Sequence, residues 1–147
     1  MIQGKWFPPG SPLQDALSIR QQVFQLGGDE LDHSAWNVVV YDEDIPCGTG
    51  RIWWAEGAFH LGDICVLPAS RHRKLGDLVL RLLLFKAQSH SARLIQVQCP
   101  PQTTGFFTRL GFLETNTAGH LHTLLLRGED ICLDTCQGCT QACPHRR

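Results

Sequence analysis

Apolar side chains recur at helical spacing in two segments of the chain. The stronger pattern follows residue 74, where one stripe of an amphipathic helix is formed by Leu75, Leu78, Val79, Leu82 and Leu83. A second pattern covers residues 11–26. There Ser11 is placed to cap the helix, Pro12 suits the first helical position and Gln14 completes a capping box. The pattern therefore predicts two helices.

Runs of apolar and β-branched residues, typical of strands, lie between and after these helices. Residues 36–42 and 47–54 flank a turn and predict an antiparallel hairpin. Four more strands and a short helix are predicted, the strands at 57–67, 93–99, 111–114 and 120–127 and the helix at 103–110. This order predicts an α/β (α+β) domain around one sheet.

Composition and charge narrow the class of protein. The 147 residues are 43% hydrophobic and 18% charged, as expected for one domain with a real core. We expect a cytoplasmic protein without membrane attachment, because no apolar run approaches a membrane span and the first ten residues lack a signal-peptide pattern. A net charge of -1 argues against a nucleic-acid partner.

Basic residues crowd the start of the helix that follows residue 74. Arg71, Arg73 and Lys74 lie there, although the helix dipole disfavours cations at that end. The placement is understandable if an external anion binds the free backbone N–H groups of the first turn. Gly76 would allow close approach to the backbone, and the arginines would add charge-assisted hydrogen bonds. A solvated basic helix start is the alternative, and spacing alone does not separate the two.

In order along the chain, these segments resemble the GNAT superfamily of acyl-CoA-dependent N-acyltransferases, over about residues 20–113. The family signature is Arg or Gln, two residues, Gly, one residue, then Gly or Ala. Here it reads Arg71-His-Arg-Lys74-Leu-Gly76 after "DICVLP", with Lys74 in place of the first glycine. Upstream, "IRQQVF" and "DHSAWNVVVYDEDIPCGTGRI" look like the family's first helix and hairpin, and "GFFTRLGF" matches a downstream motif.

The resemblance implies a single GNAT-like domain, expected at residues 1–127, with a mixed, mostly antiparallel central sheet flanked by helices. The cysteine-rich tail at 128–147 lies outside the resemblance. It also implies acetyl-CoA as cosubstrate. The pyrophosphate would be held by the turn and helix start, at Arg71, Arg73, Lys74, Leu75, Gly76 and Asp77. The strand residues Ile64, Cys65 and Val66 would pair with the pantetheine amides where their strand separates from 93–99. Phe106 and Phe107 would form apolar walls, whereas Asp77 adds a negative charge near the proposed phosphates.

In this family the amine attacks the thioester directly, so catalysis needs positioning, a base and a proton for the departing thiolate. Some members carry a glutamate base eleven residues before the signature arginine. That position is His60 here, and the ordinary pKa of histidine, about 6.5, suits a base. A half-exposed strand histidine without a catalytic role is the alternative. Asp63, Asp32 and His122 are lesser candidates.

The proton donor is less clear from the sequence. The family's usual acid is a tyrosine at the position of Phe107, and a phenyl ring cannot donate a proton. The single tyrosine, Tyr41, belongs to the distant predicted hairpin. Water, Cys99 or a nearby threonine remains as the donor, or the thiolate departs unassisted.

Cysteines fall into two groups. Cys47, Cys65 and Cys99 lie in apolar segments and are expected to be small core residues. The other four stand at i, i+4, i+7 and i+11 near the C-terminus, at Cys132, Cys136, Cys139 and Cys143. Their spacing partly resembles iron–sulfur ligand runs and also fits a structural zinc site. A helix that buries its cysteine face and a set of disulfides are the alternatives.

The first hypothesis is an N-acetyltransferase that moves an acetyl group from acetyl-CoA to the amine of a small molecule or protein. The alternative is a catalytically weak GNAT-like module that binds CoA or acts as a sensor, with its tail binding metal or responding to redox state. A metal-binding adaptor rests on the tail alone. Sheet edges or the tail offer a route to a homodimer, which nothing in the sequence requires.

Overall fold

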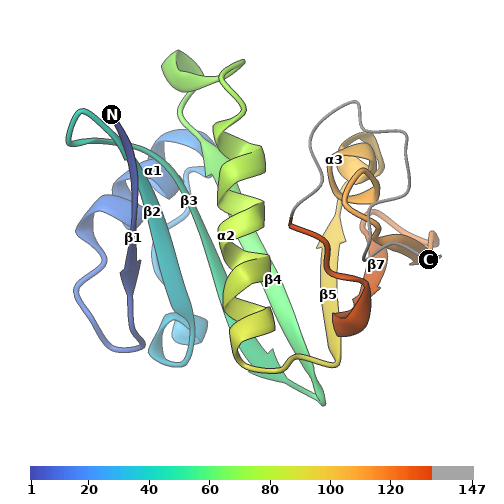
Figure 1. Cartoon of the computed structure of the whole chain (residues 1–147). Coiled ribbons are helices and arrows are strands. Elements are labelled where there is room, and N and C mark those ends of the chain that lie inside the picture. The colour runs from blue at the N-terminus through green and yellow to red at the C-terminus, as the bar shows by residue number, and fades with distance from the viewer. Residues whose placement is uncertain (134–147) are drawn as a thin grey trace.

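The computed structural model describes residues 1–133 and consists of one sheet with helices on both faces (Figure 1). The strands are β1 (Ile2–Phe7), β2 (Trp36–Asp42), β3 (Ile45–Ala55), β4 (Ala58–Val66), β5 (Leu94–Cys99), β6 (Leu113–Asn116) and β7 (His122–Arg127). The α-helices are α1 (Gln14–Phe24), α2 (Leu75–Ser89) and α3 (Thr104–Thr108).

The sheet has seven strands in the order β1-β2-β3-β4-β5-β7-β6. The β4–β5 pair is parallel, because α2 connects these two strands, and the other neighbouring pairs are antiparallel. This is the mixed, mostly antiparallel sheet expected from the sequence.

Two features of the N-terminal region differ from the sequence-based prediction. Residues 2–7, for which no strand was predicted, form β1 and pair antiparallel with β2 at the sheet edge. Helix α1 begins at Gln14, and its N-cap is Leu13 with no side-chain cap. The predicted capping box on Ser11 is therefore wrong. The Ser11 hydroxyl instead donates to the Pro8 carbonyl, which closes a turn before the helix.

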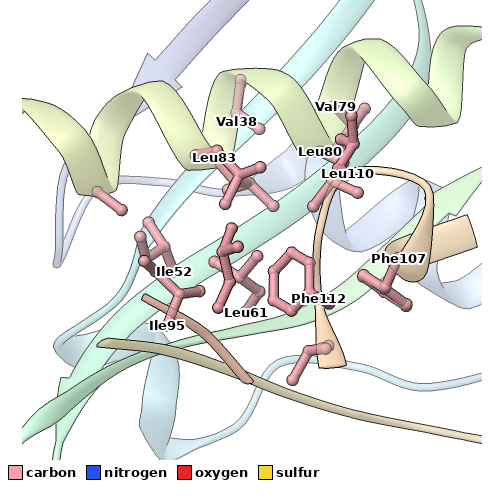
Figure 2. Close-up of a cluster of buried hydrophobic side chains, with 14 of the residues drawn as sticks. Val38, Ile52, Leu61, Val79, Leu80, Leu83, Ile95, Phe107, Leu110 and Phe112 are labelled. Atoms are coloured by element: carbon pink, nitrogen blue, oxygen red, sulfur yellow. The ribbon is translucent and has the colours of Figure 1, made fainter. Parts of the chain in front are cut away.

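The core lies mainly between α2 and the sheet. Val79, Leu80 and Leu83 of α2 are fully buried and pack over the sheet residues Ile52 and Leu61 (Figure 2). The alternation of β2 places neighbouring side chains on opposite faces. Val38 and Val40 thus face the α2 side, whereas Val39 belongs to a smaller cluster under α1 that includes Ala16 and Ile19.

The packed domain continues past residue 127. Ile131 is buried in the same core as α2, and Leu133 packs against that core. The boundary expected at 127/128 therefore does not mark the end of the packed chain, which extends at least to Leu133. Of the four tail cysteines, Cys132 is buried, and Cys136, Cys139 and Cys143 lie outside the described residues.

Candidate active site

Strands β4 and β5 are paired only over a short stretch. Their parallel register runs from Phe59 opposite Ile95 to Leu61 opposite Val97. Beyond these residues the strands diverge, as Figure 1 shows between the end of α2 that carries Leu75 and α3. Residues 62–66 of β4 therefore carry backbone groups on the β5 side without a strand partner in the described chain. A cleft of about 850 Å³ lies at this divergence.

The cleft is bounded by five elements of the described chain. Its floor is formed by residues 62–66 of β4 and residues 97–99 of β5. One end is closed by the turn before α2 and the first turn of that helix, and one side by Phe106, Phe107 and Arg109. The C-terminal turn of α1 adds Val23 and Phe24. The predicted strand, turn and aromatic residues are therefore brought together around one cavity.

The turn before α2 has a strained backbone. His72 and Lys74 both adopt a left-handed conformation, with φ of 66° and 62°. Lys74 is the N-cap of α2, and no side chain caps the helix. The N–H groups of Leu75, Gly76 and Asp77 belong to the first turn, which has no intrahelical acceptors for them. The start of α2 therefore leaves these three backbone N–H groups without intrahelical acceptors at the cleft.

The three basic residues of this turn have different surroundings. Arg71 lines the cleft, and its Nε donates to the Val66 carbonyl at 3.2 Å. Lys74 also lines the cleft. Arg73 does not, because its guanidinium lies 2.6 Å from the Asp42 carboxylate in an ion pair with the β2 end of the hairpin. Of the three residues, Arg71 and Lys74 thus line the cleft, whereas Arg73 does not.

Gly76 faces the aromatic side of the cleft. A Cβ placed on Gly76 would lie 3.5 Å from the Phe106 ring, which is an ordinary contact distance. Phe107 is buried, and its ring makes edge contacts with Phe106 and Phe112 at centroid distances of 5.0 and 5.7 Å. Phe107 is therefore a core residue as well as a wall of the cleft.

Asp63 lies at a bulge in β4. The register between β3 and β4 shifts between Thr49 and Arg51, and Asp63 has a positive φ of 51°. This conformation turns its carboxylate toward Arg51, 2.9 Å away, and toward the Nε of Arg20, 3.7 Å away. The side chain is 23% exposed and lines the cleft. The Asp63 carboxylate is therefore oriented by two arginines of the protein interior and is also accessible from the cleft.

The residues behind Asp63 form an ionic network around two buried arginines. Arg20 is completely buried and donates two hydrogen bonds to Asp32, at 2.9 and 3.0 Å. A third Arg20 bond goes to the amide oxygen of Asn37. Arg51 contacts Asp32 at 3.2 Å and binds both carboxylate oxygens of Asp29, at 2.6 and 2.9 Å. The Nε atoms of both arginines are buried without a hydrogen-bond acceptor among residues 1–133.

The network changes the acidity of its carboxyl groups. Burial alone would raise the pKa of Asp32, but hydrogen bonds from Arg20 and from the Asp29 amide outweigh it and lower the pKa to about 2. A hydrogen bond from Arg51 likewise lowers the pKa of Asp29. Asp32, a lesser candidate for the base, is thus a structural carboxylate committed to two arginines.

Sequence reasoning missed Arg20 and Arg51. The sequence did indicate that Arg20 is buried, because Arg20 follows Ala16 by four residues and so lies on the buried face of α1. A charged residue within an apolar stripe indicates a buried partner. The partners could not be named, since they come from the loop after α1 and from two strands.

His60 is not among the residues that line the cleft. Its ring stacks on Trp53 at a centroid distance of 5.6 Å, and its Nε2 lies 3.0 Å from the Ala55 carbonyl. His122 on β7 is also absent from the lining, and its Nδ1 lies 3.7 Å from Glu114. Of the residues expected to act as base, the cleft receives Asp63.

Some of the candidate proton donors line the cleft and others do not. Cys99 lines the cleft and is buried, and Thr103 lines it with its hydroxyl donating to the Pro100 carbonyl at 2.9 Å. Cys65 lines it too, and burial raises the pKa of its thiol to about 12. Tyr41 lies elsewhere, with its hydroxyl bonded to Asp15. As expected, Cys47, Cys65 and Cys99 are buried free thiols.

Comparison with known proteins identifies the family. The sequence model described as the acetyltransferase (GNAT) domain matches residues 33–114, more than half of the chain. The chain belongs to the GNAT family. The resemblance carried by the signature turn is thus confirmed, and the chain is an N-acetyltransferase whose family uses acetyl-CoA as cosubstrate.

Two relatives of known sequence illustrate the similarity. Glucosamine 6-phosphate N-acetyltransferase 1 of Oryza sativa subsp. japonica is 37% identical over 123 residues, covering 74% of this chain and 69% of its own length. The uncharacterized N-acetyltransferase YjcF of Bacillus subtilis is 29% identical over 108 residues, covering 68% of this chain and 77% of its own.

Solved structures share the fold at low sequence identity. An acyl-CoA N-acyltransferase from Pseudomonas aeruginosa has a TM-score of 0.75 at 14% identity, covering 85% of this chain and 99% of its own. The PaiA N-acetyltransferase of Thermoplasma acidophilum, solved in complex with coenzyme A, has a TM-score of 0.68 at 10% identity, covering 86% and 99%. These likenesses support the GNAT fold.

Within residues 1–133, no cluster of three or more His, Cys, Asp or Glu side chains is arranged to hold a metal ion. In the same region, no helix has both the length and the apolar character needed to cross a membrane.

Proposed function

We propose that this GNAT protein transfers the acetyl group of acetyl-CoA to a primary amine, which attacks the thioester directly in the cleft between β4 and β5. The observation that carries the proposal is the divergence of these strands beside the uncapped start of α2. Unpaired strand groups suit the amides of an extended pantetheine arm, and free helix N–H groups suit a diphosphate.

The coenzyme would bind in two parts. Its diphosphate would accept hydrogen bonds from the N–H groups at Leu75, Gly76 and Asp77, with Arg71 and Lys74 adding positive charge. Its pantetheine arm would lie along residues 64–66. The side chain of Arg73 would contribute little to coenzyme binding, because it is paired with Asp42. The proposed set of binding residues is therefore smaller than the set expected from the sequence.

Asp63 would receive the acceptor. A carboxylate at the cleft surface attracts the ammonium form of an amine and can accept its proton as attack begins. The position at the β4 bulge lies directly before the residues assigned to pantetheine, so the amine and the thioester would meet there. The proton for the departing thiolate would come from Cys99, Thr103 or solvent.

Calorimetric titration with acetyl-CoA tests the binding half of this proposal. Wild type should bind at micromolar Kd, and Arg71→Ala should bind at least about tenfold more weakly, since a charge-assisted bond is lost. Arg73→Ala is the matched control, because it removes the same charge from the same turn outside the cleft, and its Kd should change less than about threefold. Absence of binding to folded wild-type protein would contradict the proposal.

Amine-dependent release of free CoA tests the transfer half. The screen should cover small amines, amino sugars, including the glucosamine 6-phosphate of the rice relative's name, and peptides with a free N-terminus. Acetyl-CoA binding without release of CoA in the presence of any amine would favour the alternative, a CoA-binding or sensor module. The observation behind that alternative is Phe107, which stands where the family's tyrosine acid is expected.

The cysteine-rich tail is a separate part of the proposal. Cys132 is disulfide-bonded in the structure, and after reduction it would supply, together with Cys136, Cys139 and Cys143, thiolate ligands to zinc or an iron–sulfur cluster. Elemental analysis of anaerobically purified full-length protein, with an absorption spectrum, distinguishes these two metals from metal-free thiols. A content below about 0.5 equivalents of zinc or iron per protein chain would contradict a metal role.

A further inference from the structure

Asp77 places a negative charge where the proposed function requires an anion to bind. It lies in the first turn of α2 and lines the cleft. An acidic side chain in the first turn stabilises a helix when no external anion is bound, because its negative charge interacts favourably with the helix dipole. A diphosphate at the same N-terminus would be repelled by that carboxylate unless another group offsets the charge.

Arg81 provides the offsetting charge from one turn further along α2. Its Nε donates to Asp77 Oδ2 at 2.7 Å, at the i,i+4 spacing that brings two side chains together on a helix. Both side chains are only 23% exposed, so solvent and salt screen the pair less than a surface pair.

The guanidinium of Arg81 is also fixed from its other side. Its NH1 group donates to the Leu133 carbonyl at 3.2 Å. Leu133 packs against the main core, and Ile131 is buried within it, so this acceptor belongs to a packed segment. Arg81 is therefore held between the C-terminal segment and Asp77.

We propose that Arg81 is a positioning residue for coenzyme binding, which neutralises Asp77 and turns its carboxylate away from the diphosphate. This inference rests on the proposed function, because the anion concerned is the diphosphate of acetyl-CoA. Arg81 acts through Asp77 and needs no contact with the coenzyme.

A purely structural role for Arg81, to tie Leu133 to α2, makes a different prediction. If neutralisation matters, removal of the Asp77 carboxylate should cancel the effect of removing the guanidinium. If the tie to Leu133 matters, removal of the carboxylate should restore nothing. A double-mutant cycle therefore separates the two roles.

Calorimetric titration of acetyl-CoA at low ionic strength should use wild type, Arg81→Gln, Asp77→Asn and the double variant. We expect Arg81→Gln to raise Kd about tenfold and the double variant to bind within about twofold of Asp77→Asn. The effect of Arg81→Gln should shrink at high salt. Arg127→Gln is the matched control, because Arg127 forms exposed ion pairs with Glu129 and Asp130, and its Kd should equal that of wild type.

Thermal melts should accompany each titration, and Arg81→Lys provides a second variant that keeps the charge. Arg81→Lys should retain most of the affinity. Binding of Arg81→Gln at wild-type Kd, or a double variant as weak as Arg81→Gln, would overturn the inference and leave the proposed function standing. Failure of wild type to bind acetyl-CoA would overturn both.

Discussion

Arg51 and Asp63 form an ion pair across the boundary between the protein interior and the cleft, with 2.9 Å between guanidinium and carboxylate. Arg51 is buried and held by Asp29 and Asp32, whereas Asp63 is partly open to the cavity. The interior thus fixes the orientation of the one carboxylate proposed to meet the acceptor. Several measurable consequences arise from this arrangement and from the turn at α2.

Asp63→Asn should lower kcat/KM for the amine by about 100-fold, the size of effect typical for loss of a positioned proton acceptor. Asparagine tolerates the left-handed backbone that Asp63 adopts, so the bulge should persist. Kd for acetyl-CoA, measured by calorimetry, should stay within about threefold of wild type.

Asp44→Asn is the control for Asp63→Asn. Asp44 also has a positive φ, of 69°, but it is exposed in the hairpin between β2 and β3. Equal kinetic losses in both variants, or an unchanged kcat/KM in Asp63→Asn, would remove Asp63 from the mechanism.

Gly76→Ala should separate binding from folding. The added methyl group meets Phe106 at an ordinary contact distance and removes the chain entropy of a helical glycine, so the free energy of unfolding should rise by about 0.5–1 kcal/mol. The same methyl group would occupy space needed by the diphosphate, and Kd for acetyl-CoA should rise about tenfold or more. Gly105→Ala, at an open position in α3 outside the cleft lining, should give a similar gain in stability and leave Kd unchanged. A normal Kd for Gly76→Ala would place the diphosphate elsewhere.

Lys74→Gly should stabilise the protein. A left-handed conformation costs an L-residue about 1–2 kcal/mol, and glycine adopts it without that strain but gives back about 0.5–1 kcal/mol in chain entropy. The net gain should be about 0.5–1 kcal/mol in urea unfolding. Ser91→Gly, with φ of 56° just after α2, should give a similar gain far from the cleft. A loss of stability in Lys74→Gly alone would show that the lysine side chain outweighs the backbone strain.

The buried network should make stability sensitive to acid. The pKa of Asp32 is lowered from 3.8 to about 2 in the folded protein, so its stabilising contribution is complete above the unfolded value. It should be lost as the pH falls from about 4 through about 2. Urea unfolding followed across this range should therefore show a steep decline for wild type.

Asp32→Asn should flatten that decline and lower stability at neutral pH, because Arg20 would remain buried with a neutral partner. Glu30→Gln changes an exposed carboxyl of the same short turn and should keep the wild-type pH profile. An unaltered profile in Asp32→Asn would indicate that other carboxyl groups cause the acid loss.

Much of the fold could be predicted because periodicity and turn residues are local. The stripe from Leu75 to Leu83 determines α2, and the runs around residues 43–46 determine the β2–β3 hairpin. Strand β1 could not be predicted in this way. Its residues are mostly exposed and lack clear alternation, and their pairing with β2 is a tertiary contact.

The site also has a local part that could be predicted from the sequence and a long-range part that could not. The turn from Arg71 to Gly76 is contiguous, so its chemistry could be predicted, although the diversion of Arg73 to Asp42 could not. The setting of Asp63 depends on Arg20 and Arg51, which are 43 and 12 positions away in sequence and meet it only through the fold. Such long-range side-chain contacts leave little trace in one sequence.

The brief pairing of β4 with β5 also bears on how the molecule withstands unfolding. Within residues 1–133, the parallel ladder that joins the first four strands to the last three has three residue pairs, and the core under α2 spans both parts. A pantetheine arm bonded along residues 64–66 would act as an extra strand at that junction. Amide hydrogens there should exchange more slowly once acetyl-CoA is bound, and the cosubstrate would then serve as a structural member of the sheet as well as the acetyl donor.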